Sequence, residues 1–256
     1  MSDQGVSNIT LEVMEGRDRL RDFIALPHRL YASDPAWVAP LNFMQRERFS
    51  PRNHFFEHAR WRGWVAYRDG RPVGRITAQV DQMHLARHQD GVGYFGMFES
   101  ERDPVVVKAL FGAAEEWLRG EGMQRARGPY NLNVNEEVGL LVDGFSTPPF
   151  VLMGHALPWY GESVEGQGYS PVKDLLAYHI RPDFEAPRVM TKLAQRVSDR
   201  VSVRPVRRRQ LVEDAEVMRG IFNDAWHENW SFVPLAEDEW RDTVSYTHLT
   251  LPTIQL

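Results

Sequence analysis

The chain contains no cysteine among its 256 residues. Disulfide bonds, thiolate metal sites and a cysteine nucleophile are therefore excluded, and the composition fits a reducing compartment. Lysine is also scarce, because Lys108, Lys173 and Lys192 are the only examples and nearly every cation is an arginine. Genomic base composition explains this bias most simply, so we assign it no function.

Long apolar runs and targeting segments are missing as well. The first residues, MSDQGVSNITLEVMEG, lack the basic and apolar parts of a secretory signal. No stretch approaches the roughly 18 apolar residues that a membrane span needs. We therefore expect a soluble, cytoplasmic protein without a transmembrane segment, for which only peripheral membrane contact remains open. The net charge of −5 argues against a nucleic-acid partner.

The pattern of the first 128 residues predicts a mixed sheet with helices. Alternating apolar positions predict four strands, and residues 69–72 supply a turn between the second and the third. Helical spacing predicts a helix from Arg17 that Pro27 kinks or ends near its middle. Asp103 can cap a long helix that follows the fourth strand, and a short strand follows this helix. The five predicted strands are residues 10–15, 61–67, 73–81, 92–98 and 124–128.

The remaining sequence predicts the end of one unit and the start of another. Residues 129–149 form a long polar loop, and two further predicted strands, 150–154 and 171–180, close the first unit around a turn or helix at 158–168. Residues 181–200 are a linker, and 201–243 repeat the opening pattern of a strand, here 201–206, followed by helices, which indicates an internal duplication. We thus expect a domain at 1–180 and the truncated start of a second at 201–243.

The last residues, VSYTHLTLPTIQL at 244–256, do not continue the preceding helical pattern. They resemble translated adaptor read-through, which ends many open reading frames in metagenomic assemblies. We expect this tail to be artefactual. A genuine C-terminal strand is the alternative.

The order of predicted elements over residues 9–180 resembles that of the GNAT acyltransferase superfamily. Particular segments resemble a bacterial two-domain branch of it that includes bacterial ceramide synthase. These segments are DPAWVAPL, NHFFEHA, DGRPVGRI, GYFGMFE, RGPYNLNVNEEVGLLVDGF, GYSPVKDLLAY and NDAWHENWSFVPL. The resemblance implies an α/β fold with a mixed, mostly antiparallel sheet flanked by helices, followed by a truncated second unit of the same kind.

The same resemblance implies a function. The full-length protein would transfer an acyl group from acyl-CoA or an acyl carrier to an amine, such as a sphingoid-type lipid amine, with acyl-CoA as co-substrate and no tightly bound cofactor. We expect this fragment alone to be inactive. The alternative from another class is a non-catalytic binding or scaffold module of GNAT shape.

The usual phosphate cradle of such a fold is not recognisable here. A pyrophosphate needs backbone N–H groups from a glycine-rich loop at a helix N-terminus. The stretch GMFESERDPVVV has no glycine between Met97 and the predicted helix. Glu99, Glu101 and Asp103 would repel phosphate there. We expect a degenerate phosphate loop in the first domain, and the residues that bind the acyl donor remain unknown.

His155 and Tyr160 are the candidate catalytic residues. His155 follows a predicted strand, where a general base is expected in acyl transfer, and Tyr160 could donate a proton to a leaving thiolate. Both residues can equally be structural, His155 as a satisfied histidine and Tyr160 as a packing aromatic. A hydrolase that uses His155 is a weaker alternative, because no serine elbow or cysteine accompanies it.

Seven further residues are candidates for substrate binding. Polar groups gather in the long loop beside the strand that carries Arg127, and an aromatic helix end follows in the second unit. The residues are Arg127, Asn131, Asn133, Asn135, Glu136, Asn229 and Trp230. Asparagine also forms turns readily, and the aromatic helix end can equally be a plug between the two units.

We expect no metal site. His54 and His58, like His84 and His88, have the four-residue spacing that can chelate a metal on a helix, but two ligands do not make a site. The glycines at 91 and 93 are too common a pattern to indicate phosphate binding. The basic run at 204–210 is more typical of a solvated helix start than of a headgroup site.

Overall fold

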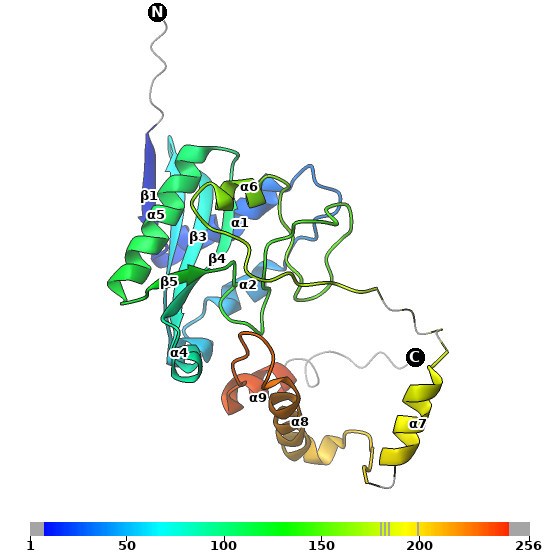
Figure 1. Cartoon of the computed structure of the whole chain (residues 1–256). Helices are drawn as coiled ribbons and strands as arrows, with labels where there is room; N and C mark the ends of the chain where they lie inside the picture. Colours follow the sequence, from blue (N-terminus) through cyan, green and yellow to red (C-terminus); the bar gives the residue numbers. More distant parts are fainter. Residues whose placement is uncertain (1–7, 180, 182, 184, 199, 246–256) are drawn as a thin grey trace, which may run out of the picture.

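The computed structural model describes residues 8–179, 181, 183, 185–198 and 200–245. Its centre is a five-stranded sheet in the order β1-β2-β3-β4-β5 (Figure 1). Neighbouring strands are antiparallel except for β4 and β5, which are parallel. The strands are β1 Ile9–Val13, β2 Ala59–Arg68, β3 Arg71–Asp81, β4 Val92–Ser100 and β5 Arg125–Arg127. The predicted mixed, mostly antiparallel α/β sheet is confirmed.

Helices cover both faces of this sheet. On one face, α5 (Pro104–Gly120) packs Leu110 and Phe111 against Ile76 and Phe95 of the central strands. On the other face, Phe23 of α1 (Gly16–Leu30) packs with residues from β2 and from around α2 and α3. Helices α2 (Asn42–Arg48), α3 (Phe55–His58), α4 (Gln82–His88) and α6 (Tyr160–Glu165) complete this part of the chain. Burial on both faces explains why β3 is buried almost throughout.

Local sequence signals explain the long helix α5. The Asp103 carboxylate accepts a hydrogen bond from the Val105 N–H at 2.8 Å, and Pro104, which has no N–H to satisfy, begins the helix. Gly122, with φ +84°, then turns the chain away after the last helical residue. Pro27, in contrast, does not end α1 near its middle, because the helix continues to Leu30 and Pro27 lies buried in its last turn.

Three predicted strands are wrong. Residues 150–154, 171–179 and 201–206 are turn or irregular, and they expose apolar side chains such as Val151 and Val203. An apolar run becomes a strand only where a neighbouring edge pairs with it. The sheet ends at β5, which pairs with β4 through three residues, and none of these segments pairs with β5.

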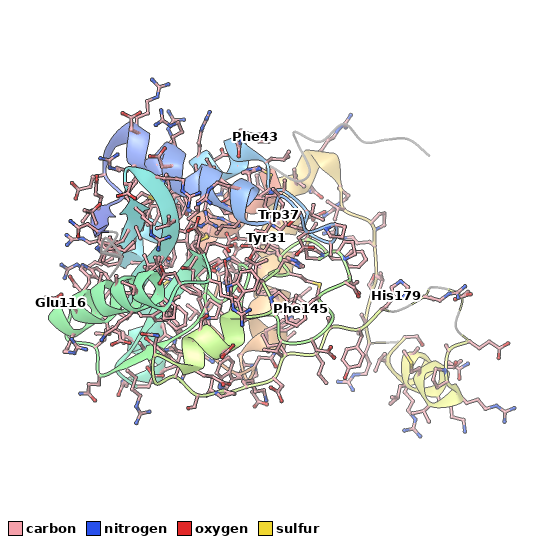
Figure 2. All side chains as sticks on the ribbon, turned by 90° about the horizontal axis from the view of Figure 1, so that it is seen from above. Tyr31, Trp37, Phe43, Glu116, Phe145 and His179 are labelled. Carbon is pink, nitrogen blue, oxygen red and sulfur yellow. The ribbon has the colours of Figure 1, made fainter. Side chains whose placement is uncertain are left out.

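The C-terminal part of the described chain is helical. It contains α7 (Arg188–Val197), a 3-10 turn η1 (Arg208–Gln210), α8 (Leu211–Trp226) and α9 (Glu237–Ser245). Figure 2, seen from above, places His179 on the segment that leads from the body of the molecule to α7. The predicted foreign tail overlaps the end of α9 at residues 244 and 245, and its remainder, 246–256, lies outside the described residues.

Candidate active site

A β-bulge in β4 organises the candidate site. Arg75 of β3 pairs with Glu99, whereas Thr77 pairs with Gly96, so Met97 and Phe98 together oppose a single residue of β3. Met97 takes the left-handed conformation, with φ +49°. Its N–H receives a partner from outside the sheet, because Asn131 Oδ1 accepts a hydrogen bond from it at 2.8 Å.

The chain beyond β5 lies directly against β4 at this point. The Tyr130 N–H donates to the Phe95 carbonyl at 2.8 Å. A Cβ added to Gly96 would lie 1.8 Å from the Tyr130 carbonyl oxygen, and one added to Gly128 would lie 2.3 Å from the Phe95 carbonyl oxygen. Only glycine permits such an approach of two backbones. The polar loop therefore starts from a fixed position on the sheet.

Glu99 is the centre of a buried polar cluster, the Glu99 cluster, formed by Tyr31, Arg75, Glu99, Ser100 and Tyr160. The hydroxyls of Tyr31 and Tyr160 both donate to Glu99 Oε2 at 2.8 Å. The Ser100 N–H donates to the Tyr160 hydroxyl at 3.0 Å. Arg75 places Nη2 3.7 Å from Glu99 Oε1 and donates from Nη1 to the Phe23 carbonyl at 2.8 Å.

Burial dominates the electrostatics of this cluster. It raises the pKa of Glu99, although Arg75 and the two hydroxyls favour the carboxylate. It likewise raises the pKa of Tyr31 and Tyr160, and the neighbouring Glu99 charge adds to this effect. Both tyrosines therefore remain protonated donors. Tyr160, a predicted catalytic acid, directs its proton to Glu99.

His155, the predicted base, is oriented by a carboxylate. Its Nε2 lies 2.8 Å from Asp34 Oδ2, and its ring lies 5.6 Å from the Tyr31 ring, which links it to the Glu99 cluster. Although burial raises the pKa of Asp34, hydrogen bonds from His155 and the Ala36 N–H lower it overall. An ionised Asp34 accepts a hydrogen bond from Nε2–H, which leaves the lone pair on Nδ1. Nδ1 is buried and has no hydrogen-bond partner within the described part of the chain.

The asparagines of the long loop chiefly make structural contacts. Asn131 bridges the bulge to the loop, because its Nδ2 donates to Glu137 Oε2 at 2.8 Å. Asn133 Oδ1 accepts from the Asn135 N–H at 2.8 Å, which is a local turn. The Glu136 carboxylate binds Arg48 Nη2 at 2.8 Å, and burial raises the pKa of Glu136 despite this cation.

The other predicted substrate-binding residues lie elsewhere, at the start of β4. The Arg127 guanidinium lies 5.0 Å from the centre of the Trp230 ring and 4.0 Å from Asp90 Oδ2. Nearby, the Ser231 hydroxyl lies 3.2 Å from that of Tyr94. Asn229 is exposed, and its carbonyl accepts from the Phe232 N–H at 3.1 Å. This segment therefore docks the C-terminal helices onto the sheet.

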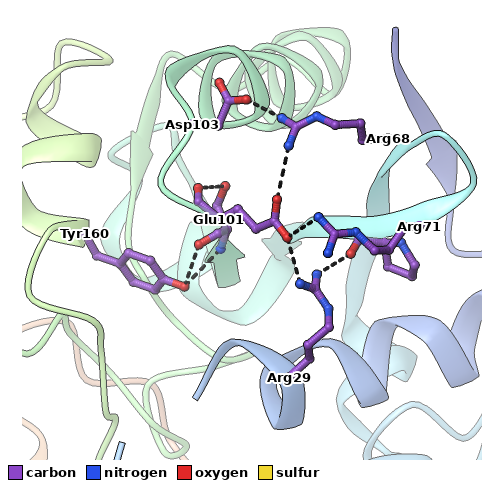
Figure 3. A network of polar contacts seen from close by, with 8 residues as sticks. Arg29, Arg68, Arg71, Glu101, Asp103 and Tyr160 are labelled. Carbon is purple, nitrogen blue, oxygen red and sulfur yellow. Dashed lines mark hydrogen bonds and ion pairs between the residues drawn. The ribbon is translucent and has the colours of Figure 1, made fainter. Parts of the chain in front are cut away.

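The N-terminus of α5 is closed by side chains (Figure 3). Glu101 binds Arg29 at 2.7 Å, Arg71 at 2.9 Å and Arg68 at 3.2 Å. Arg68 also binds Asp103, whose carboxylate caps the helix. The acidic residues predicted to repel phosphate are thus paired with arginines, and Glu99 points into the core. With Pro104 lacking an N–H and Asp103 in the cap, this end does not fit a pyrophosphate.

One group of side chains has metal-ligand spacing. The ligand atoms of His54, Glu57 and Asp238 lie within 4.8 Å of one another, but both acids are exposed. Exposed acids commonly group together without a metal. His58 binds Asp81 at 3.0 Å and Glu239 at 3.2 Å, and the absence of a metal site remains a prediction.

Sequence reasoning missed Tyr31, Asp34 and Arg75. Arg75 had a misleading signal, because alternation groups it with Thr77 and Gln79 on the polar face of the strand, whereas the structure buries that face as well. Tyr31 and Asp34 had no local sequence signal, since they meet Glu99 and His155 only across 68 and 121 residues of sequence.

No model of a known protein family matches the chain. Two curated bacterial proteins do match it. Protein YghO of Escherichia coli strain K12 is 42% identical over 224 residues, and bacterial ceramide synthase of Caulobacter vibrioides is 44% identical over 225 residues. Each match covers 87% of this chain, which spans only 57% and 59% of the two relatives. The predicted similarity to bacterial ceramide synthase is confirmed.

Solved structures overlap the chain more loosely. The aminoglycoside acetyltransferase AAC(6')-Iy, in complex with a CoA bisubstrate analogue, has a TM-score of 0.41 at 14% identity, covering 68% of this chain and 99% of its own. A tandem GNAT protein from the clavulanic acid biosynthesis pathway has a TM-score of 0.42 at 15% identity. The match covers 63% of this chain and 43% of that protein. A putative acetyltransferase from Pyrococcus furiosus has a TM-score of 0.39 at 15% identity. The match covers 68% of this chain and 100% of that protein.

Proposed function

We propose that the chain is part of an N-acyltransferase that transfers an acyl group from a thioester donor, acyl-CoA or an acyl carrier, to an amine. The observation that carries this proposal is the 44% identity with bacterial ceramide synthase along 225 residues. The name of that relative also supports a sphingoid-type lipid amine as the acceptor. We further propose a first domain at 1–180, a linker at 181–200 and the start of a second domain at 201–243.

In this proposal His155 accepts the proton of the attacking amine. Asp34 holds Nε2 at 2.8 Å, so Nδ1 is the nitrogen that takes up the proton as the C–N bond forms and the C–S bond breaks. The ionised Asp34 then stabilises the imidazolium. Tyr160 supports the site by holding Glu99, and it can donate to the leaving thiolate only by giving up that bond.

The substrate amine is proposed to meet the acidic side of the long loop. Glu136 and Glu137 share one arginine, Arg48, which leaves an excess of negative charge for an ammonium group. Asn131, Asn133 and Asn135 shape this loop. Arg127, Asn229 and Trp230 lie at the other end of β4, where we propose a contact with the polar part of a larger substrate.

A specific observation favours a second candidate, a non-catalytic binding module. Asp103, Pro104 and the arginines around Glu101 close the N-terminus of α5, where a GNAT phosphate cradle is expected. If the acyl donor binds nowhere else on the protein, the first domain is such a module. The two candidates differ in donor binding.

Calorimetric titration with acetyl-CoA and palmitoyl-CoA tests donor binding directly. Mass spectrometry of a mixture of palmitoyl-CoA and sphinganine tests amide formation, with the full-length Caulobacter relative as positive control. The acyltransferase proposal expects product from the relative and loss of at least about 100-fold in rate when the residue equivalent to His155 becomes glutamine. Absence of binding by any donor to either protein would favour the binding module.

A further inference from the structure

Helix α7 separates apolar and basic residues completely. At about 100° per residue, the apolar residues of the helix fill an arc of about 140°; they are Val189, Met190, Leu193, Ala194 and Val197. Arg188, Thr191, Lys192, Gln195 and Arg196 fill the opposite arc. Every described residue of α7 is exposed, including Val189 at 67% and Leu193 at 53%. In Figures 1 and 2 the helix lies apart from the sheet.

The polar face of α7 is entirely cationic or neutral. The helix contains no acidic residue, and within the described chain no ion pair engages Arg188, Lys192 or Arg196. Residues 181–210 hold nine arginines and lysines against three acids, in a chain whose net charge is −5. The positive charge is therefore concentrated around this one amphipathic helix.

The segments on either side of α7 add exposed apolar groups. Leu175, Leu176 and Tyr178 precede it, and Val201 and Val203 follow it, with exposed fractions of 57% or more. Isolated exposed apolar residues are ordinary, but a run of them flanking an amphipathic helix marks an interaction surface. A protein partner would need acidic groups matched to each cation, whereas a lipid surface offers a continuous negative layer above an apolar phase.

We propose that α7 lies in the surface of an anionic lipid bilayer, with Val189, Met190, Leu193 and Val197 among the acyl chains. Arg188, Lys192 and Arg196 then face the anionic headgroups. This inference goes beyond the acyl transfer proposed above and does not depend on it. A lipid-facing helix beside the first domain would bring the protein to the phase that contains lipid amines.

The absence of cysteine in the chain makes a site-specific test clean. Each of three single-cysteine variants carries one fluorescent label. Leu193→Cys places it on the apolar face of α7 and Gln195→Cys on the polar face. Val105→Cys on α5 serves as a distant exposed control. Labelled whole chain is mixed with vesicles of phosphatidylcholine containing 30% phosphatidylglycerol, or of phosphatidylcholine alone. The expected result is a blue-shifted, severalfold brighter emission from residue 193 only, with the anionic vesicles only.

Charge reversal provides the second measurement. A triple variant should weaken vesicle binding by roughly 100-fold or more, because each basic residue contributes about fivefold. Its substitutions are Arg188→Glu, Lys192→Glu and Arg196→Glu. Lys108→Glu with Arg119→Glu on α5 should leave vesicle binding unchanged. The proposal is overturned by equal responses at residues 193 and 195, by no response to anionic vesicles, or by a concentration-dependent change without vesicles, which would indicate a second copy as the partner.

Discussion

The ring of His155 and the carboxylate of Asp34 meet across 121 residues of sequence, with Nε2 2.8 Å from Oδ2. Asp34 lies just beyond α1, and His155 follows the long polar loop. The pairing fixes which nitrogen carries the proton. It also makes Asp34 a positioning residue for the proposed base.

Asp34→Asn should therefore change both stability and tautomer. The charged hydrogen bond becomes a neutral one, so the free energy of unfolding should fall by about 1 kcal/mol in urea titration. Nitrogen NMR should show Nε2–H as the dominant tautomer of His155 in the parent and a mixture in the variant. Asp183→Asn, at an exposed ion pair with Arg181, is the neutral control. An unchanged tautomer would contradict the assigned role.

Tyr160→Phe should cost more stability than Tyr31→Phe. The first change removes a donor to Glu99 and also the acceptor of the Ser100 N–H, whereas the second removes only a donor. We expect losses of about 2–3 kcal/mol and about 1–2 kcal/mol in the free energy of unfolding. Tyr178→Phe, at an exposed residue, should have no measurable effect. Equal losses from the two buried tyrosines would show that Ser100 does not depend on Tyr160.

Gly96→Ala should destabilise the sheet by about 3 kcal/mol or more, because its Cβ would overlap the Tyr130 carbonyl oxygen. Gly112→Ala is the matched control. It lies in α5 with nothing within 4 Å of the added Cβ, so helix propensity should stabilise the protein by up to about 1 kcal/mol. Guanidinium unfolding of both variants measures the contrast. A tolerated Gly96→Ala would mean that the loop after β5 is not held against β4.

The sequence predicted those parts of the fold that local pattern decides. The hairpin of β2 and β3 and the capped helix α5 follow from alternation, turn residues and Asp103. The segment at 201–206 also carries alternating valines, but it pairs with no strand. Local periodicity does not determine whether a segment lies beside a strand with which it can pair. The candidate site was half predictable for the same reason. His155 and Tyr160 were proposed from their positions in the sequence. Asp34 and Tyr31, in contrast, reach His155 and Glu99 only through the packing of α1.

The last prediction concerns pH and the attachment of α9. His58 lies between Asp81 and Glu239, and although burial lowers its pKa, the hydrogen bonds to these two carboxylates raise it to about 9. Because this exceeds the unfolded value of about 6.5, the stabilising contribution should be fully present below about pH 6.5 and lost as the pH rises through about 9. Urea unfolding from pH 6 to pH 10 should show this decline in the parent and a flatter profile in His58→Gln. His227→Gln, at an exposed histidine, should retain the parent profile, and a decline of the same size in His58→Gln would place the titrating group elsewhere.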